Sequence, residues 1–120
     1  MPAVPSTVTA MRGDMAAFAT SVGIADPLLS SVKLAVSEAV TNAVVHAYVD
    51  APRPGLVRVA ASIEGDSLLV EVCDDGSGMM PRLDSPGLGV GLPVIADMAD
   101  TLDIGNSARG GTRLRMSFRV

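Results

Sequence analysis

The sequence has 120 residues, of which 48% are hydrophobic and 2% aromatic, and its formal net charge is −4. This length fits one domain, which we expect to span residues 1–120 around a single core of aliphatic side chains and methionine. The negative charge argues against a nucleic-acid-binding protein, since phosphate contacts require a basic surface. No apolar run approaches the ~20 residues that cross a bilayer, and no signal-peptide pattern opens the chain, so we expect a soluble, cytoplasmic protein.

The apolar pattern predicts two helices before any strand. Apolar residues recur at helical spacing over residues 6–22, and Gly23 ends this pattern. Asp26-Pro27 fits the start of a second helix, whose apolar face continues over residues 28–48. Residues 50–55 contain two prolines and a glycine, which predicts a loop.

The second half of the chain predicts strands and one short helix. Alternating apolar residues indicate strands over 56–63 and 68–73, joined by a hairpin turn. Residues 74–91 are rich in glycine and proline, which predicts turns, and a helix over 92–99 and strands over 101–104 and 112–119 follow. This order predicts an α+β fold, a two-layer sandwich of a mostly antiparallel four-stranded sheet with about three helices on one face.

Three side chains have simple structural interpretations. Cys73 is the only cysteine, which excludes an internal disulfide and a cysteine metal cluster, and we expect it to be a small buried core residue. Arg113 and Arg115 share one face of the last strand, and a solvated sheet face is the simplest interpretation.

Polar residues on the second predicted helix form the first candidate site. Glu38 and Asn42 are four positions apart, so they stack ~40° apart on one side of the helix, at the border of its apolar face. Half-buried polar groups need partners. The alternative is a glutamate favoured by the helix dipole and a solvated asparagine. His46 follows one turn later, but no second histidine exists to build a metal site with it.

The second candidate is Asp74-Asp75-Gly76-Ser77-Gly78-Met79, at the end of a predicted strand. Alternating glycines let the backbone approach a flat ligand closely. The ionised carboxylate of Asp74 only accepts hydrogen bonds, so it suits an exocyclic amine such as that of adenine. An ordinary polar turn between two elements is the alternative.

The third candidate is Gly87-Leu88-Gly89-Val90-Gly91-Leu92-Pro93, which opens the third helix. Backbone N–H groups at a helix start, together with the helix dipole, favour phosphate. The spacing matches neither a Walker A loop nor a dinucleotide-binding fingerprint. A flexible start of a helix is the alternative.

Together and in this order, the segments resemble the Bergerat-fold ATPases, the superfamily of gyrase, heat-shock chaperone, histidine-kinase and mismatch-repair ATPases. Within it, the chain is similar to the stand-alone bacterial anti-sigma factor serine/threonine kinases. The resemblance rests on SEAVTNAVVHAY (residues 37–48), DDGSGM (residues 74–79), GLGVGLPVI (residues 87–95) and Gly110-Gly111-Thr112. It covers roughly residues 5 to 118.

The resemblance implies a role for each matching residue. Glu38 would be the general base, and Asn42 would give its side-chain oxygen to Mg²⁺. Asp74 would hold the adenine amine, with Thr112 nearby. The backbone segments that would shape the adenine pocket and wrap the phosphates are Gly76 and Gly78, and then Gly87, Leu88, Gly89, Val90, Gly91 and Leu92.

The same resemblance implies an ATP–Mg²⁺-dependent kinase that sequesters a sigma factor and phosphorylates a serine or threonine of an anti-anti-sigma (STAS-type) protein. It also implies a homodimer. Two features depart from the family: the segment before the first helix is too short for the usual N-terminal strand, and the lid, Met80 to Pro86, is short. A nucleotide-gated protein-binding regulator without kinase activity is therefore the alternative, and a scaffold that has lost its nucleotide is a third hypothesis.

Overall fold

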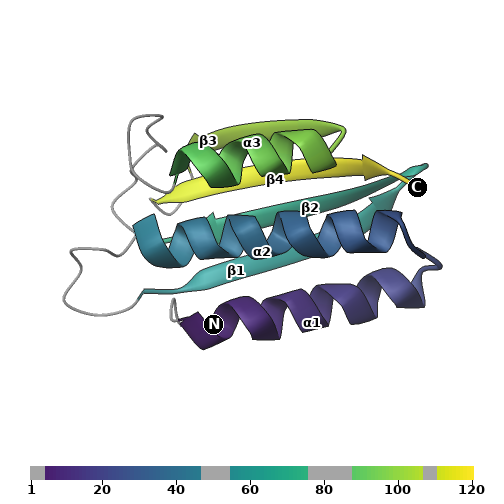
Figure 1. The fold of residues 1–120 in the computed structure, drawn as a ribbon, viewed down its shortest axis with the longest axis horizontal. Helices are drawn as coiled ribbons and strands as arrows, with labels where there is room; N and C mark the ends of the chain where they lie inside the picture. Colours follow the sequence, from purple (N-terminus) through teal and green to yellow (C-terminus); the bar gives the residue numbers. More distant parts are fainter. Residues whose placement is uncertain (1–4, 47–54, 76–87, 107–110) are drawn as a thin grey trace.

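The computed structural model describes residues 5–46, 55–75, 88–106 and 111–120. All helices lie on one face of a four-stranded sheet, with α2 between α1 and α3 (Figure 1). This arrangement confirms the predicted α+β sandwich. In chain order the elements are α1 (Pro5–Ser21), α2 (Leu28–His46), β1 (Val57–Glu64), β2 (Ser67–Asp74), α3 (Leu88–Met98), β3 (Thr101–Asn106) and β4 (Thr112–Arg119).

The described sheet has the strand order β1-β2-β4-β3, and each neighbouring pair is antiparallel. In this register Val57 lies opposite Asp74, and Cys73 lies opposite Arg113. Antiparallel pairing therefore brings the end of β2 beside the beginnings of β1 and β4.

The core lies between the sheet and the helices. In β2, Leu68, Val70 and Val72 alternate toward the helices and are at most 3% exposed, as the period of a strand requires. The helices bury residues three or four positions apart, because these share one face. These helix residues are Met11, Met15 and Ala19 on α1 and Val32, Ala35, Val36, Ala39, Val40 and Ala43 on α2.

The start of α3 differs from the prediction. The helix begins at Leu88, not at residue 92, so part of the glycine-rich segment is helical. Glycine costs about 1 kcal/mol in a helix interior, but packing outweighs such a preference. Here Ile95 is completely buried, and α3 contacts both α2 and β3. The second helix is described only to His46, so the last two residues of its predicted span lie outside the described residues.

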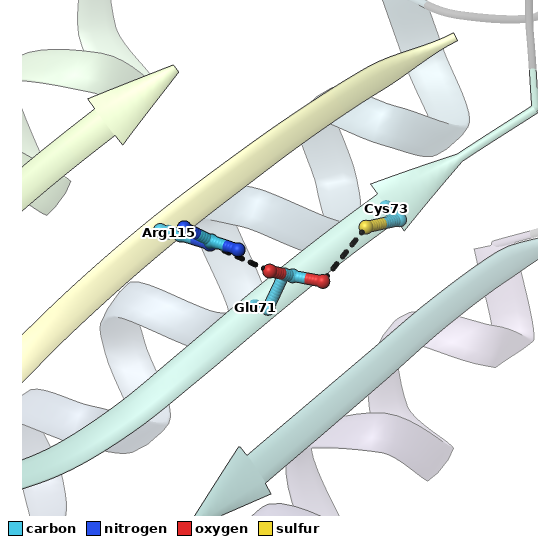
Figure 2. A network of polar contacts seen from close by, with 3 residues as sticks. All are labelled: Glu71, Cys73 and Arg115. Carbon is cyan, nitrogen blue, oxygen red and sulfur yellow. Dashed lines mark hydrogen bonds and ion pairs between the residues drawn. The ribbon is translucent and has the colours of Figure 1, made fainter. Parts of the chain in front are cut away.

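The outer face of the sheet is polar. Figure 2 shows the Glu71 carboxylate between Arg115 of β4 and Cys73 of β2. Arg115 Nε donates to Glu71 Oε2 at 2.7 Å, and Cys73 Sγ donates to Glu71 Oε1 at 3.4 Å. The solvated position predicted for Arg115 is confirmed, whereas Arg113 is half-buried and its Nε is buried without a partner among the described residues. Cys73 is buried, as expected, but it shares the outer face with Glu71 and lies outside the core cluster.

Burial and charge act in opposite directions on these two groups. The hydrogen bond from Arg115 holds the pKa of Glu71 below its ordinary value, despite partial burial. Burial and the hydrogen bond to Glu71 raise the pKa of the Cys73 thiol. The Cys73 thiol therefore loses its proton less readily than a free thiol does. Within the described residues, no helix has both the length and the apolar character that crossing a bilayer would require.

Candidate functional site

Four elements meet at one end of the molecule. The C-terminal ends of α2 and β2 and the first residues of α3 and β4 all lie at the left of Figure 1. These elements carry Asn42, Asp74, Leu88 and Thr112, respectively. The fold therefore gathers four segments that are separated in the sequence.

Asp74 is the last residue of β2 and is only 9% exposed. The Thr112 backbone N–H donates to Asp74 Oδ1 at 3.4 Å, from the first residue of β4. A carboxylate in such a place needs donors around it. The structure thus brings together the two residues to which the resemblance assigns the adenine.

Gly111 makes this contact between β2 and β4 sterically possible. Its φ is +83°, a conformation that side chains with a Cβ rarely adopt. A Cβ on Gly111 would lie 2.0 Å from the backbone oxygen of Asp74 and 3.0 Å from its Oδ1. The glycine therefore lets β4 begin directly against Asp74. The sequence offered the Gly110-Gly111-Thr112 motif as the signal, but Gly111 was not among the predicted site residues.

Asp75 fixes the same strand end from the other side. Its Oδ1 accepts a hydrogen bond from Leu56 N at 2.8 Å, and its own N–H donates to Leu56 O at 3.3 Å. These bonds continue the β1–β2 pairing one step beyond Val57 and Asp74. Asp75 therefore anchors the strand end that presents Asp74. Sequence reasoning placed Asp75 in the motif but gave it no role.

Glu38 and Asn42 are both half-buried on α2, next to the buried Ala35 and Ala39. Asn42 Nδ2 is buried and has no hydrogen-bond partner among the described residues. Leaving a buried amide group unsatisfied costs about 1–3 kcal/mol. An amide in this state suits a polar ligand at this end of α2, as a nucleotide-binding role would require.

The first turn of α3 supplies further donors. The first N–H groups of a helix lack intrahelical partners and carry partial positive charge. In α3 this turn begins at Leu88 and includes Gly89, Val90 and Gly91 of the predicted phosphate segment, and Leu92 follows in the same helix. Gly76, Gly78 and Gly87, and the predicted lid, lie outside the described residues.

A model of the histidine kinase-like ATPase domain matches residues 1–118. The chain belongs to this family. Its curated relatives include an anti-sigma F factor of Clostridium kluyveri, 37% identical over 88% of this chain and 80% of the relative. Another is the anti-sigma F factor of Thermoanaerobacter sp. (strain X514), 32% identical with the same coverage. The resemblance drawn from the sequence motifs is confirmed.

Solved structures agree on the fold of this ATPase domain. The histidine kinase domain of the Erythrobacter litoralis EL346 blue-light activated histidine kinase superposes with a TM-score of 0.65 over 93% of this chain, at 22% identity. The chain spans 60% of that structure. The histidine kinase domain of the E. coli osmosensor EnvZ gives a TM-score of 0.53 at 29% identity, over 77% of this chain and 65% of that structure.

The described part of this ATPase domain contains no group of three or more His, Cys, Asp or Glu side chains that could hold a metal ion. Magnesium at nucleotide sites commonly uses only one or two protein ligands, together with phosphate oxygens and water. An asparagine oxygen belongs to the oxygen ligands that Mg²⁺ prefers. The side chain of Asn42 therefore fits a nucleotide-associated Mg²⁺.

Proposed function

We propose that this ATPase domain is an anti-sigma regulatory kinase. It binds ATP with Mg²⁺, sequesters a sigma factor, and phosphorylates a serine or threonine of an anti-anti-sigma protein of the STAS type. The contact of Asp74 with Gly111 and Thr112 carries the proposal, because it builds an acceptor site at the end where α3 begins. The likeness to anti-sigma F factors over 80% of their length supports the regulatory part.

In this proposal, the nucleotide lies across the end of the sheet. Asp74 accepts the adenine amine, and Thr112 contributes its hydroxyl, directly or through water. Gly76 and Gly78 shape the same pocket. Gly87 and the N–H groups at the start of α3, from Leu88 to Leu92, surround the phosphates. An acceptor-only carboxylate at the base would favour adenine over guanine, which presents a carbonyl there.

Magnesium would be held by Asn42, with the phosphates and water as its other ligands. ATP supplies the transferable phosphoryl group, and Mg²⁺ neutralises its charge. Phosphoryl transfer asks the protein mainly for positioning and charge stabilisation. Asn42 is half-buried on α2, so its amide oxygen can serve Mg²⁺ while its Nδ2, which has no partner among the described residues, donates to a phosphate oxygen.

Glu38 is the proposed general base. It lies one helical turn before Asn42 on α2, half-buried beside Ala35 and Ala39. Its carboxylate takes the proton of the attacking serine or threonine hydroxyl. General base catalysis contributes typically 10²–10⁴-fold to a rate.

The test is transfer of radiolabel from ATP to a candidate anti-anti-sigma protein, with ATP affinity measured on the same preparations. Glu38→Gln should slow transfer roughly 10²-fold or more while ATP still binds. Glu64→Gln, on the exposed end of β1, is the matched control and should keep the wild-type rate. Transfer that is unchanged in Glu38→Gln contradicts the proposed base.

The same assay separates the kinase from the regulator without catalysis. If the wild-type domain binds ATP and captures a sigma factor only with ATP, yet transfers no label, the nucleotide-gated alternative is correct. If it neither binds ATP nor gains thermal stability from it, the scaffold hypothesis is correct. A homodimer remains part of the proposal and is checked by sedimentation of the purified protein.

A further inference from the structure

The two proposed functional residues of α2 each follow a residue with a hydroxyl side chain. Ser37 directly precedes Glu38, and Thr41 directly precedes Asn42. Ser37 and Thr41 are half-buried and four positions apart, so they form a stripe of their own beside that of Glu38 and Asn42. Alanine is a better helix former than either residue, so helix formation alone does not explain a hydroxyl at these two positions.

Both hydroxyls bond the backbone of the preceding turn. Ser37 Oγ donates to Lys33 O at 2.8 Å, and Thr41 Oγ1 donates to Ser37 O at 2.7 Å. In an α-helix the same carbonyls also accept the N–H groups four residues later. Each carbonyl oxygen has two lone pairs, so it holds both donors, and the hydroxyl competes with the helical N–H group. The carbonyls of Lys33 and Ser37 are therefore shared between a side chain and the backbone.

This sharing affects the shape of the helix. A serine or threonine that bonds the carbonyl four residues earlier lengthens the helical hydrogen bond there and often bends the helix. Two such bonds follow each other on one side of α2, over the same turns that carry Glu38 and Asn42. The directions in which these two side chains leave the helix therefore depend on the hydroxyls of Ser37 and Thr41.

The first turns of α2 provide a comparison. Ser31 Oγ contacts Pro27 O at 3.5 Å, and this contact is exposed to solvent. An exposed hydroxyl can exchange such a bond for one to water, so it constrains the helix little. Ser31 also lies nearly two turns before Glu38. The short, half-buried bonds from a hydroxyl to a carbonyl of α2 are those beside the proposed site.

We propose that Ser37 and Thr41 are positioning residues for phosphoryl transfer. Their hydroxyls set the curvature of α2 and thereby the directions of the Glu38 carboxylate and the Asn42 amide. They act through these two side chains and not on the substrate. The inference rests on the proposed function, since it assigns a role relative to the proposed base and Mg²⁺ ligand. A misplacement of about 1 Å can cost about 10²-fold in rate, so small changes in curvature matter.

The experiment removes each hydroxyl with little change in the size of the side chain. Ser37→Ala and Thr41→Val abolish the two bonds, whereas Ser37→Thr and Thr41→Ser keep a hydroxyl at the same position. Ser31→Ala makes the same chemical change near the start of α2 and is the matched control. The kcat and the KM for ATP come from radiolabel transfer to a candidate anti-anti-sigma protein, ATP–Mg²⁺ affinity from titration calorimetry, and stability from urea unfolding.

We expect the two variants without a hydroxyl to differ in what they lose. Ser37→Ala should lower kcat roughly threefold to tenfold with little change in the KM for ATP, because Glu38 acts in the chemical step. Thr41→Val should also weaken ATP–Mg²⁺ binding roughly threefold or more, because it displaces Asn42. Ser37→Ala should keep the wild-type stability, since the better helix former offsets the lost hydrogen bond. Ser31→Ala and the two variants that keep the hydroxyl should behave like the wild type.

Three results would overturn the inference. These are an unchanged kcat in both Ser37→Ala and Thr41→Val, equal losses in Thr41→Val and Thr41→Ser, and an equal loss in Ser31→Ala. If the wild type binds ATP but transfers no label, the kinase proposal is wrong, and the ATP–Mg²⁺ affinities of Thr41→Val and Thr41→Ser decide the inference on their own. If the wild type does not bind ATP, both the proposed function and this inference are wrong.

Discussion

Replacing Gly111 with alanine tests the contact that builds the candidate site. The new Cβ would lie 2.0 Å from Asp74 O and 2.8 Å from Asp74 C, and both are backbone atoms that cannot simply rotate away. The positive φ of +83° adds strain of about 1–2 kcal/mol for a residue with a Cβ. Relief of the overlap by a backbone shift adds about 1–3 kcal/mol. We therefore expect Gly111→Ala to lower the free energy of unfolding by about 3 kcal/mol.

The control for this prediction is Gly65→Ala, in the β1–β2 hairpin. Gly65 has a positive φ of +61°, but its Cβ would meet nothing within 4 Å. This variant should lose only the backbone term, about 1–2 kcal/mol, and should keep its ATP affinity. Both free energies come from urea unfolding, and ATP affinity from titration calorimetry. If the two variants lose equal stability and both bind ATP like the wild type, the reasoning about Gly111 and Asp74 is wrong.

Three further predictions concern polar groups. The pKa of Glu71 lies below its ordinary value, first because of the hydrogen bond from Arg115, so its stabilising effect is present at neutral pH and is lost as pH falls through the lowered value. The urea midpoint of unfolding should therefore fall less at acid pH in Glu71→Gln than in the wild type. An equal fall in both proteins would contradict this prediction. The raised pKa of Cys73 predicts slow alkylation by iodoacetamide at about pH 8, faster in Glu71→Gln, and rapid wild-type labelling would be the opposite result. Asn42→Leu should raise the unfolding free energy of the nucleotide-free protein by about 1 kcal/mol and lose Mg²⁺-dependent ATP binding; retention of that binding would remove Asn42 from the site.

Local patterns predicted most of the fold. The β1–β2 hairpin follows from period-two alternation on both sides of a turn with Gly65, and the structure pairs Glu64 with Ser67 as that pattern requires. The spacing of Val32, Ala35, Val36 and their neighbours predicted the buried face of α2 in the same way. Such periods depend on residues close in sequence, so a single sequence contains them.

The beginning of α3 could not be predicted from local preference. Glycines at Gly89 and Gly91 indicate a loop by propensity, whereas the packing of Ile95 against the core sustains a helix from Leu88. That packing involves elements far away in sequence. Propensity alone therefore placed the helix start too late.

The contacts of the candidate site could not be predicted either, because they join residues that are far apart in the sequence. Asp75 bonds Leu56, nineteen residues away, and Thr112 bonds Asp74 across thirty-eight residues. The motifs predicted that Asp74 and Thr112 belong to one site, but not which atoms meet or why Gly111 must be a glycine. The roles of Glu38 and Asn42 remain predictions from the family resemblance.

ATP binding by the intact domain tests the central claim most directly. Unfolding is measured in Mg²⁺ with saturating ATP, with GTP and without nucleotide, for the wild type and for Asp74→Asn. A ligand at about 100 times its dissociation constant stabilises a protein by about 2.7 kcal/mol. We predict a stabilisation of about this size by ATP, little by GTP, and loss of the ATP effect in Asp74→Asn. Equal stabilisation by both nucleotides, or an undiminished ATP effect in Asp74→Asn, would contradict the adenine site proposed at Asp74.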